Sequence, residues 1–231
     1  MNVKLISITR PASGFMQGEV GKKEMNAESL IVYCARVSNP KNQMNMETAP
    51  KLIKFLIKHK HWSPFELAGM CVEIKTSRAI AAQILRHRSI SFQEFSQRYS
   101  DATDFEPTEL RKQAESNRQS SEEEINPNLP SDYKNIPALT AVRTHLHQSK
   151  KLYDELIEEG VARECARMGL PLGTQTTMYM NGSARSWIHY INLRAEQNTQ
   201  KEHRDIANKI KDIFIEQFPN TSKALNWTNE K

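Results

Sequence analysis

The stretch RHRSISFQEFSQRYS, residues Arg86–Ser100, holds three arginines, one histidine and one acidic residue, with no glycine or proline. An arginine guanidinium stays charged and presents a planar fork of donors that fits a phosphate group. The single carboxylate of Glu94 cannot neutralise three guanidiniums, so the segment favours an external anion over a merely solvated basic face. His87 lies between two arginines, and like charge disfavours its protonated form, so we expect a neutral imidazole.

The composition of the whole chain sets wider bounds. Its 231 residues are enough for a sizeable core, and a formal net charge of +5 suits polyanionic partners such as nucleotides, folates or nucleic acid. The three cysteines, Cys34, Cys71 and Cys165, have neither zinc spacing nor a disulfide pattern, so we expect no metal site and a reducing, cytoplasmic environment. No apolar run approaches the roughly 20 residues of a membrane span, so we expect no membrane partner.

Hydrophobic periodicity predicts the secondary structure around this stretch. We expect strands over residues 3–9, 67–75 and 174–180, and helices over residues 26–37, 46–58, 77–85, 138–159, 162–168, 184–195 and 201–218. Thr76 or Ser77 should cap the helix that delivers Arg86, and Gly160 should end the longest helix. Residues 101–137 are polar and contain four prolines, so we expect a surface excursion with partial order at best.

The order of residues in the opening stretch resembles the signature of the flavin-dependent thymidylate synthases. That signature is Arg-His-Arg followed after seven residues by Ser, here Arg86–Arg88 and Ser96. Its longer form, Ser-x-Asn-Glu-x-Ser-x-Arg-Tyr, matches Ser91–Tyr99 except that Gln93 replaces Asn. The resemblance extends to further segments, which are ARVS at 35–38, HWSPFE at 61–66, residues 167–171 and residues 183–194.

The resemblance implies an activity and an architecture. The activity is reductive methylation of dUMP to dTMP, with methylenetetrahydrofolate as carbon donor, NADPH as reductant and bound FAD as relay. The architecture is an α+β fold with a mixed sheet flanked by helices. Residues 1–231 would form a single domain, with the polar excursion at about 101–137, and the domain would be one subunit of a homotetramer whose sites are assembled from several chains.

The resemblance also implies site residues, carried over position by position. The implied dUMP-binding residues are Gln83, Ile84, Leu85, Arg86, Glu94, Phe95, Ser96, Gln97, Arg98, Arg167 and Arg194. The implied FAD-binding residues are Ser63, Arg86, His87, Arg88, Glu94, Ser183, Ala184, Arg185 and His189, with Ser38, His61 and Glu66 as further candidates. Arg194 is the catalytic candidate, because a fixed guanidinium can stabilise negative charge that develops on the uracil ring.

Other interpretations of the same residues stay open at this point. Arg167 and Arg194 lie near helix ends, where they could simply complement the helix dipole, and His61 and His189 could be structural. A nucleic-acid-binding helical module would explain the basic charge. A non-catalytic assembly subunit of the same fold is compatible with Gln93 and with Ser183, where many relatives carry Asn.

Overall fold

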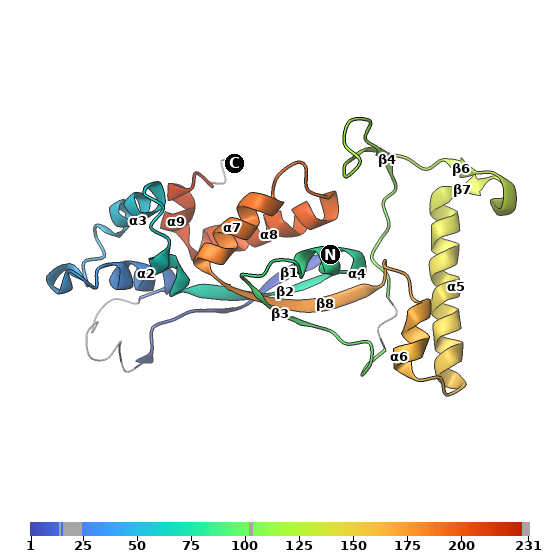
Figure 1. Ribbon diagram of the computed structural model, residues 1–231, viewed down its shortest axis with the longest axis horizontal. Coiled ribbons are helices and arrows are strands. Elements are labelled where there is room, and N and C mark those ends of the chain that lie inside the picture. Colours follow the sequence, from blue (N-terminus) through green and yellow to red (C-terminus); the bar gives the residue numbers. More distant parts are fainter. Residues whose placement is uncertain (14, 16–24, 102–103, 228–231) are drawn as a thin grey trace.

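The computed structural model describes residues 1–13, 15, 25–101 and 104–227. Its centre is a four-stranded sheet with the order β1 (Asn2–Ile8), β2 (Gly69–Ser77), β8 (Gln175–Ser183) and β3 (Ser91–Glu94), in which every neighbouring pair is antiparallel (Figure 1). The predicted α+β class is confirmed, but the predicted mixed sheet is wrong. The excursion after β3 returns to the end of the sheet from which it left, where the N–H of Gln175 donates to the carbonyl of Asp104 at 2.8 Å. Strand β8 therefore starts beside the end of β3, and the two strands pair antiparallel.

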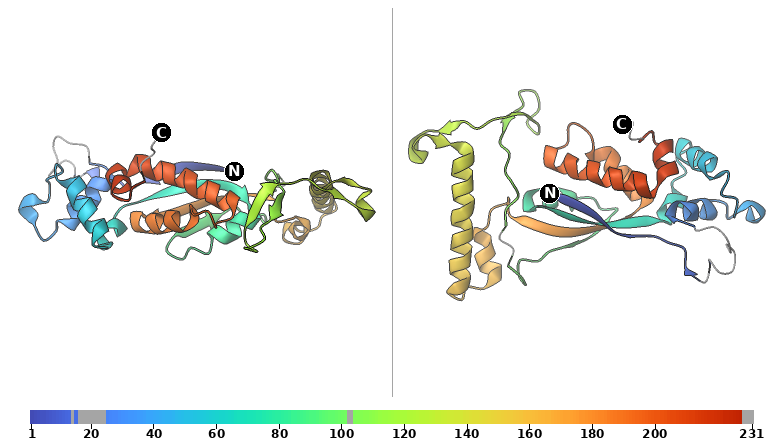
Figure 2. Two further views of the ribbon diagram at one scale, coloured as in Figure 1. Left: turned by 90° about the horizontal axis from the view of Figure 1, so that it is seen from above. Right: turned by 180° about the vertical axis from the view of Figure 1, so that it is seen from behind.

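The two faces of the sheet differ in burial. Met70, Val72 and Ile74 of β2 are buried, as are Met178 and Met180 of β8, whereas the residues between them are half-buried or exposed. This alternation is typical of an antiparallel sheet that packs on one face only. Helices α7 (Ala184–Arg194) and α8 (Lys201–Gln217) lie over the buried face (Figure 1, Figure 2).

The start of α7 depends on a close approach of two strands. A Cβ on Gly69 would lie 2.2 Å from the carbonyl oxygen of Gly182, so only glycine fits at this point of β2. Directly after it, the N–H of Ala184 donates to the carbonyl of Ala68 at 2.7 Å. The hydroxyl of Ser183 caps the helix by accepting from the N–H of Ser186 at 3.3 Å. The chain therefore turns from β8 into α7 without a linker.

A group of helices closes one end of the sheet. It contains α2 (Ala27–Ala35), η1 (Pro40–Asn42), α3 (Ala49–Lys58), η2 (Ser63–Glu66) and the C-terminal α9 (Pro219–Ala224). The buried carboxylate of Glu28 in α2 accepts from the N–H and hydroxyl of Thr221 in α9, at 2.6 and 2.7 Å. These charge-assisted hydrogen bonds tie the first helix to the last.

The excursion and a helical arm lie at the other end. The excursion holds two short hairpins, β4 (Arg111–Gln113) with β5 (Ser121–Glu124) and β6 (Asn128–Leu129) with β7 (Ile136–Pro137), and the turn η3 (Ser131–Tyr133). Residues 102 and 103 of the expected excursion lie outside the described residues. The arm consists of α5 (Ala138–Glu158), α6 (Arg163–Ala166) and η4 (Arg167–Gly169), and α5 stands apart from the sheet (Figure 1, Figure 2).

Most predicted elements are present, with shifted ends. Ser77 does cap α4 (Arg78–Ile84), accepting from the N–H of Ile80, and Gly160 follows α5 with a φ of 82°. Helix α3 begins three residues later than predicted and β8 extends three residues further, while β3 and α9 were not predicted. Within the described ranges, no helix is both long and apolar enough to cross a membrane.

Candidate active site

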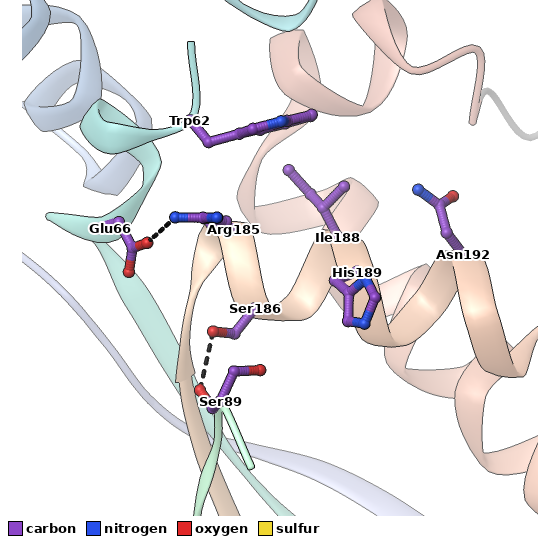
Figure 3. Close-up of a pocket in the computed structure, with 8 residues that line it drawn as sticks. All are labelled: Trp62, Glu66, Ser89, Arg185, Ser186, Ile188, His189 and Asn192. Atoms are coloured by element: carbon purple, nitrogen blue, oxygen red, sulfur yellow. Dashed lines mark hydrogen bonds and ion pairs between the residues drawn. The ribbon is translucent and has the colours of Figure 1, made fainter. Parts of the chain in front are cut away.

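A pocket of about 640 Å³ lies between η2 and α7 (Figure 3). Trp62, just before η2, lies opposite Arg185 and Ile188 of α7, and Ser89 lies at the foot of the helix. The complete lining is Trp62, Glu66, Ser89, Arg185, Ser186, Ile188, His189 and Asn192. The pocket thus combines an aromatic and an aliphatic side chain with several hydrogen-bonding groups.

The pocket collects part of the implied FAD set. Arg185 and His189 line it, as does the further candidate Glu66, whose carboxylate pairs with Arg185 at 2.5 Å. Ser183 donates to the same carboxylate at 3.5 Å. The hydroxyl of Ser186 donates to the carbonyl of Ser89 at 2.9 Å, so the helix is fastened to the loop that follows Arg88.

Other members of the implied FAD set lie away from this lining. Ala184 is the buried first residue of α7, and Ser63 and His61 are exposed near Trp62. The His61 ring contacts Phe55, with centroids 5.9 Å apart. Ser38 is exposed after α2. These residues are not joined to the pocket by any hydrogen bond among the described side chains.

On the opposite side of α7, Arg194 and His87 form a pair. The guanidinium Nε of Arg194 donates to Nε2 of His87 at 2.9 Å. Burial, followed by the charges of Arg194 and His189, lowers the pKa of His87 to about 4. The imidazole is therefore neutral, as expected, but because of burial and Arg194 rather than the flanking Arg86 and Arg88, and its ring nitrogen serves as an acceptor that fixes Arg194.

Gln83 lies next to this pair. Its Nε2 donates to Oε1 of Gln200 at 2.7 Å, and its Oε1 lies 3.3 Å from Nδ1 of His203. The rings of His87 and His203 are 6.4 Å apart, centroid to centroid. Gln83, His87 and Arg194 are called the inner cluster below, and two of the three, Gln83 and Arg194, belong to the implied dUMP set.

A second group of implied dUMP residues meets at the arm. Arg98 pairs with the carboxylate of Glu164 at 3.6 Å, and Arg167 donates to the backbone carbonyl of the same residue at 3.4 Å. Ser96 accepts from the N–H of Arg98 at 3.3 Å. Ser96, Arg98 and Arg167 are called the outer cluster below. In the described part of the chain, no hydrogen bond or ion pair joins it to the inner cluster.

Two arginines of the signature have no acidic partner among the residues that the structure describes. Arg86 and Arg88 are exposed, and no ion pair with either occurs among the described residues. Glu94, the one acid of the stretch, instead accepts from Arg78 and from the hydroxyl of Thr176, both at 3.0 Å. Two guanidiniums thus remain available for an anion.

The remaining implied dUMP residues are divided between these places. Ile84 is buried in α4, Leu85 is exposed at its end, Phe95 is half-buried, and Gln97 is buried. The carbonyl of Phe95 accepts from Arg78 at 2.9 Å, which holds the start of the segment that leads to Ser96. The side chain of Arg78 therefore anchors both ends of the dipeptide Glu94–Phe95.

The pocket has the chemistry that a flavin nucleotide needs. A flavin ring is flat, with a polar edge, and its nucleotide part carries phosphates, so it requires an apolar wall together with donors. Trp62 and Ile188 supply the wall, and Arg185, His189 and Asn192 supply polar groups. No group of three or more histidine, cysteine or acidic side chains suited to a metal ion occurs in residues 1–13, 15, 25–101 and 104–227.

The sequence interpretation missed several residues that line the pocket or contact the inner cluster, among them Trp62, Asn192 and His203. Trp62 lies inside the segment HWSPFE but was not singled out. Asn192 follows His189 by three residues, so helical periodicity could have placed both on one face. His203 gave no local signal, because its contact with Gln83 joins residues 120 positions apart.

Comparison with known proteins identifies the family to which this α+β fold belongs. The family model described as thymidylate synthase complementing protein matches residues 21–220. A probable flavin-dependent thymidylate synthase of Paramecium bursaria Chlorella virus 1 is 50% identical over 228 residues, covering 98% of this chain and 100% of the relative. A flavin-dependent thymidylate synthase of Synechocystis sp. is 47% identical over 227 residues, with the same coverage of both chains.

Among solved structures, the UMP/dUMP methylase PolB of Streptomyces cacaoi, bound with 5-Br dUMP, superposes with a TM-score of 0.75. It is 22% identical and the match covers 97% of this chain and 94% of that chain, which shows a shared fold. The chain belongs to the family of flavin-dependent thymidylate synthases, enzymes that use a flavin to methylate dUMP to dTMP.

Proposed function

We propose that this chain methylates dUMP with methylenetetrahydrofolate as carbon donor, NADPH as reductant and FAD as its flavin. The observation that carries the proposal is the Arg194 guanidinium, held at 2.9 Å by a neutral His87 beside Gln83. Bound FAD would supply the transfer of the one-carbon unit and of hydride. The chain's own residues bind, orient and polarise the uracil nucleotide.

Arg194 is proposed to stabilise negative charge on the uracil ring. A guanidinium is too basic to act as a general base, but it can stabilise charge that develops as C5 becomes nucleophilic. His87 accepts from its Nε and so directs the remaining guanidinium donors elsewhere. Because the acceptor is neutral, it leaves the positive charge of Arg194 undiminished.

Arg98 and Arg167, with the backbone around Ser96, are proposed to hold the phosphate. Their contacts within this chain are weak: Arg98 lies 3.6 Å from the exposed carboxylate of Glu164, and such pairs contribute little. Both guanidiniums can therefore turn towards a stronger dianionic partner. Arg86 and Arg88, which lack acidic partners in the described chain, are proposed to serve the FAD phosphates together with Arg185.

We propose the homotetramer that the family resemblance implies, and the separation of the two clusters in one chain supports sites that are shared between subunits. The inner cluster packs over the sheet, whereas the outer cluster is attached to the arm that stands at the end of the sheet (Figure 1). One nucleotide can contact both sets if a second subunit supplies one of them. We therefore propose that each complete site combines an inner cluster and an outer cluster from different subunits.

The test is tritium release from 5-tritiated dUMP in the presence of methylenetetrahydrofolate, NADPH and FAD. Release that requires the two co-substrates and FAD supports the proposal. A protein that binds FAD and dUMP without release would instead be a non-catalytic assembly subunit. A protein without flavin absorption, whose binding to nucleic acid falls steeply with salt, would support the nucleic-acid alternative.

A further inference from the structure

A line of hydrogen bonds connects the hairpin β4–β5 with Gln83. Arg111 of β4 donates from Nη2 to Oε1 of Glu202 at 2.6 Å, and Oε2 of Glu202 accepts from Nε2 of Gln200 at 2.9 Å. Gln200 in turn accepts from Gln83 at 2.7 Å, and Gln83 contacts His203 at 3.3 Å. The hairpin belongs to the excursion, which the proposed chemistry does not otherwise use.

The charged end of this line fixes the direction of every bond in it. Burial raises the pKa of Glu202, but hydrogen bonds from Arg111, its own backbone N–H and Gln200 outweigh this and leave the pKa below its usual range. An ionised carboxylate only accepts, so Gln200 must donate its amide N–H and present its oxygen to Gln83. Gln83 must then donate to that oxygen and present its own oxygen to His203.

The buried end of the line agrees with this direction. Oε1 of Gln83 is an acceptor, so Nδ1 of His203 must carry the proton, and Nε2 then accepts from the hydroxyl of Tyr190 at 3.1 Å. Burial, then the charges of Arg194 and His87, lowers the pKa of His203 to about 3, so the ring is neutral and one tautomer satisfies both partners. Both Tyr190 and His203 are fully buried.

We propose that Glu202, Gln200 and His203 are positioning residues that lock the side-chain amide of Gln83 in one orientation, and that this lock selects uracil over cytosine. The inference rests on the proposed function and adds to it that Gln83, in the same cluster as Arg194, addresses the uracil base. In this orientation Gln83 keeps one free N–H and one free oxygen lone pair. The edge of uracil offers a carbonyl acceptor beside the N3–H donor, whereas cytosine offers an amino donor beside the N3 acceptor. An amide that can flip would form hydrogen bonds with either base edge, whereas an amide held in one orientation forms them with the uracil edge only.

Glu202→Gln and Glu109→Gln form a matched pair of variants. Both carboxylates bind Arg111, at 2.6 and 3.0 Å, but only Glu202 belongs to the line that reaches Gln83. A glutamine at 202 can donate as well as accept, so it no longer dictates the direction at Gln200. We expect the selectivity, measured as the inhibition constant of dCMP divided by the KM for dUMP, to fall about tenfold in Glu202→Gln and to stay unchanged in Glu109→Gln.

His203→Asn and His203→Gln test the other end of the line. An asparagine amide nitrogen lies near the position of Nδ1 and retains the donor to Gln83, whereas a glutamine amide nitrogen lies nearer Nε2 and loses it. Both variants alter the same buried site, so a merely structural role predicts equal effects. We expect His203→Asn to keep the selectivity for dUMP and His203→Gln to lose it, at equal FAD content.

Equal selectivity in the wild type, Glu202→Gln and both His203 variants would overturn the inference, as would equal losses in Glu202→Gln and Glu109→Gln. If the wild type released no tritium, the proposed function would fail instead. The selectivity would then be measured as the ratio of equilibrium binding constants for dUMP and dCMP, which depends on Gln83 but not on turnover.

Discussion

The inner and outer clusters hold their arginines in different ways. In the inner cluster, Arg194 donates at 2.9 Å to a buried, neutral His87 that packs edge-on against Tyr190, with centroids 4.8 Å apart. In the outer cluster, Arg98 is exposed and lies 3.6 Å from an exposed carboxylate, and Arg167 reaches only a backbone carbonyl. The inner arginine is fixed before substrate binds, whereas the outer arginines are free to move.

This difference indicates a division of labour. A preorganised charge stabilises a transition state without further reorganisation, which favours the inner cluster for catalysis. Mobile arginines can close on a phosphate but contribute equally to the ground state and the transition state, which favours the outer cluster for binding. Variants of the inner cluster should therefore lower mainly kcat, and variants of the outer cluster should raise mainly the KM for dUMP.

The largest effect is expected for Arg194→Ala. Loss of a fixed charge at the ring should lower kcat about 100-fold or more, with a smaller change in the KM for dUMP. Steady-state tritium release measures both constants. Arg204→Ala, which removes an arginine of α8 that donates to the carbonyl of Gln197 before that helix, serves as the control and should keep wild-type kcat. A change in KM alone for Arg194→Ala would contradict the division of labour.

Two buried histidines, His87 of the inner cluster and the neighbouring His203, predict a loss of stability in mild acid. Folding lowers their pKa values from 6.5 to about 4 for His87 and about 3 for His203. Between pH 6.5 and these values the unfolded chain binds protons that the folded chain does not, so the free energy of unfolding falls as the pH falls, on the order of 3 kcal/mol for His87. Above pH 6.5 this contribution is fully present.

Urea denaturation at pH 7, 6 and 5, at one protein concentration, measures this dependence. His203→Asn should reduce the slope of the free energy of unfolding against pH between pH 6.5 and 5. His145→Gln, on the exposed surface of α5, should leave this slope unchanged. Identical slopes in the wild type and both variants would mean that folding does not lower the pKa of His203.

A smaller effect is expected for Arg98→Ala. Removing one phosphate contact should raise the KM for dUMP about tenfold and leave kcat close to the wild-type value. Glu164→Gln is the matched control: it removes the present partner of Arg98 and should change KM by less than about twofold, because exposed ion pairs contribute little. A large loss of kcat in Arg98→Ala would place this residue at the chemical step.

Local signals in the sequence predicted most of the fold. Asn26, Ser77 and Ser183 cap helices because their side chains accept from backbone N–H groups three residues ahead. Strand β3 was missed because SFQE carries no alternation of apolar and polar residues, and its structure depends on pairing with β8 about 90 positions away. The antiparallel direction of the sheet likewise depends on where the excursion returns.

The site was predicted less completely than the fold. The signature pointed to Arg86 and Arg98, and the wider resemblance pointed to Arg167 and Arg194, but neither carried information on which of these residues meet in one chain. The division of Arg98 and Arg167 from Arg194 follows from the arm, because α5 and α6 stand at the end of the sheet, away from α7 (Figure 1). The assignment of residues 1–231 to a single domain, and the role of each site residue, stay predictions.

No effect on the chemistry is expected from removing all three cysteines. Burial raises the pKa of the thiols of Cys34 and Cys71, which disfavours the nucleophilic thiolate, and Cys165 lies on the arm. A variant with Cys34, Cys71 and Cys165 changed to Ser or Ala, checked for folding and FAD content, should still form dTMP. Loss of dTMP formation that one restored cysteine rescues would show that the enzyme uses a thiol nucleophile.

The most direct test of the account mixes two impaired variants, Arg194→Ala and the double variant Arg98→Ala with Arg167→Ala. They are co-expressed in equal amounts and assayed by tritium release at limiting dUMP. If each site combines clusters from two subunits, about a quarter of the sites in random oligomers contain both intact clusters, and activity should recover to about a quarter of the wild-type value. Activity no greater than that of the better single preparation would show that both clusters of a site come from the same chain.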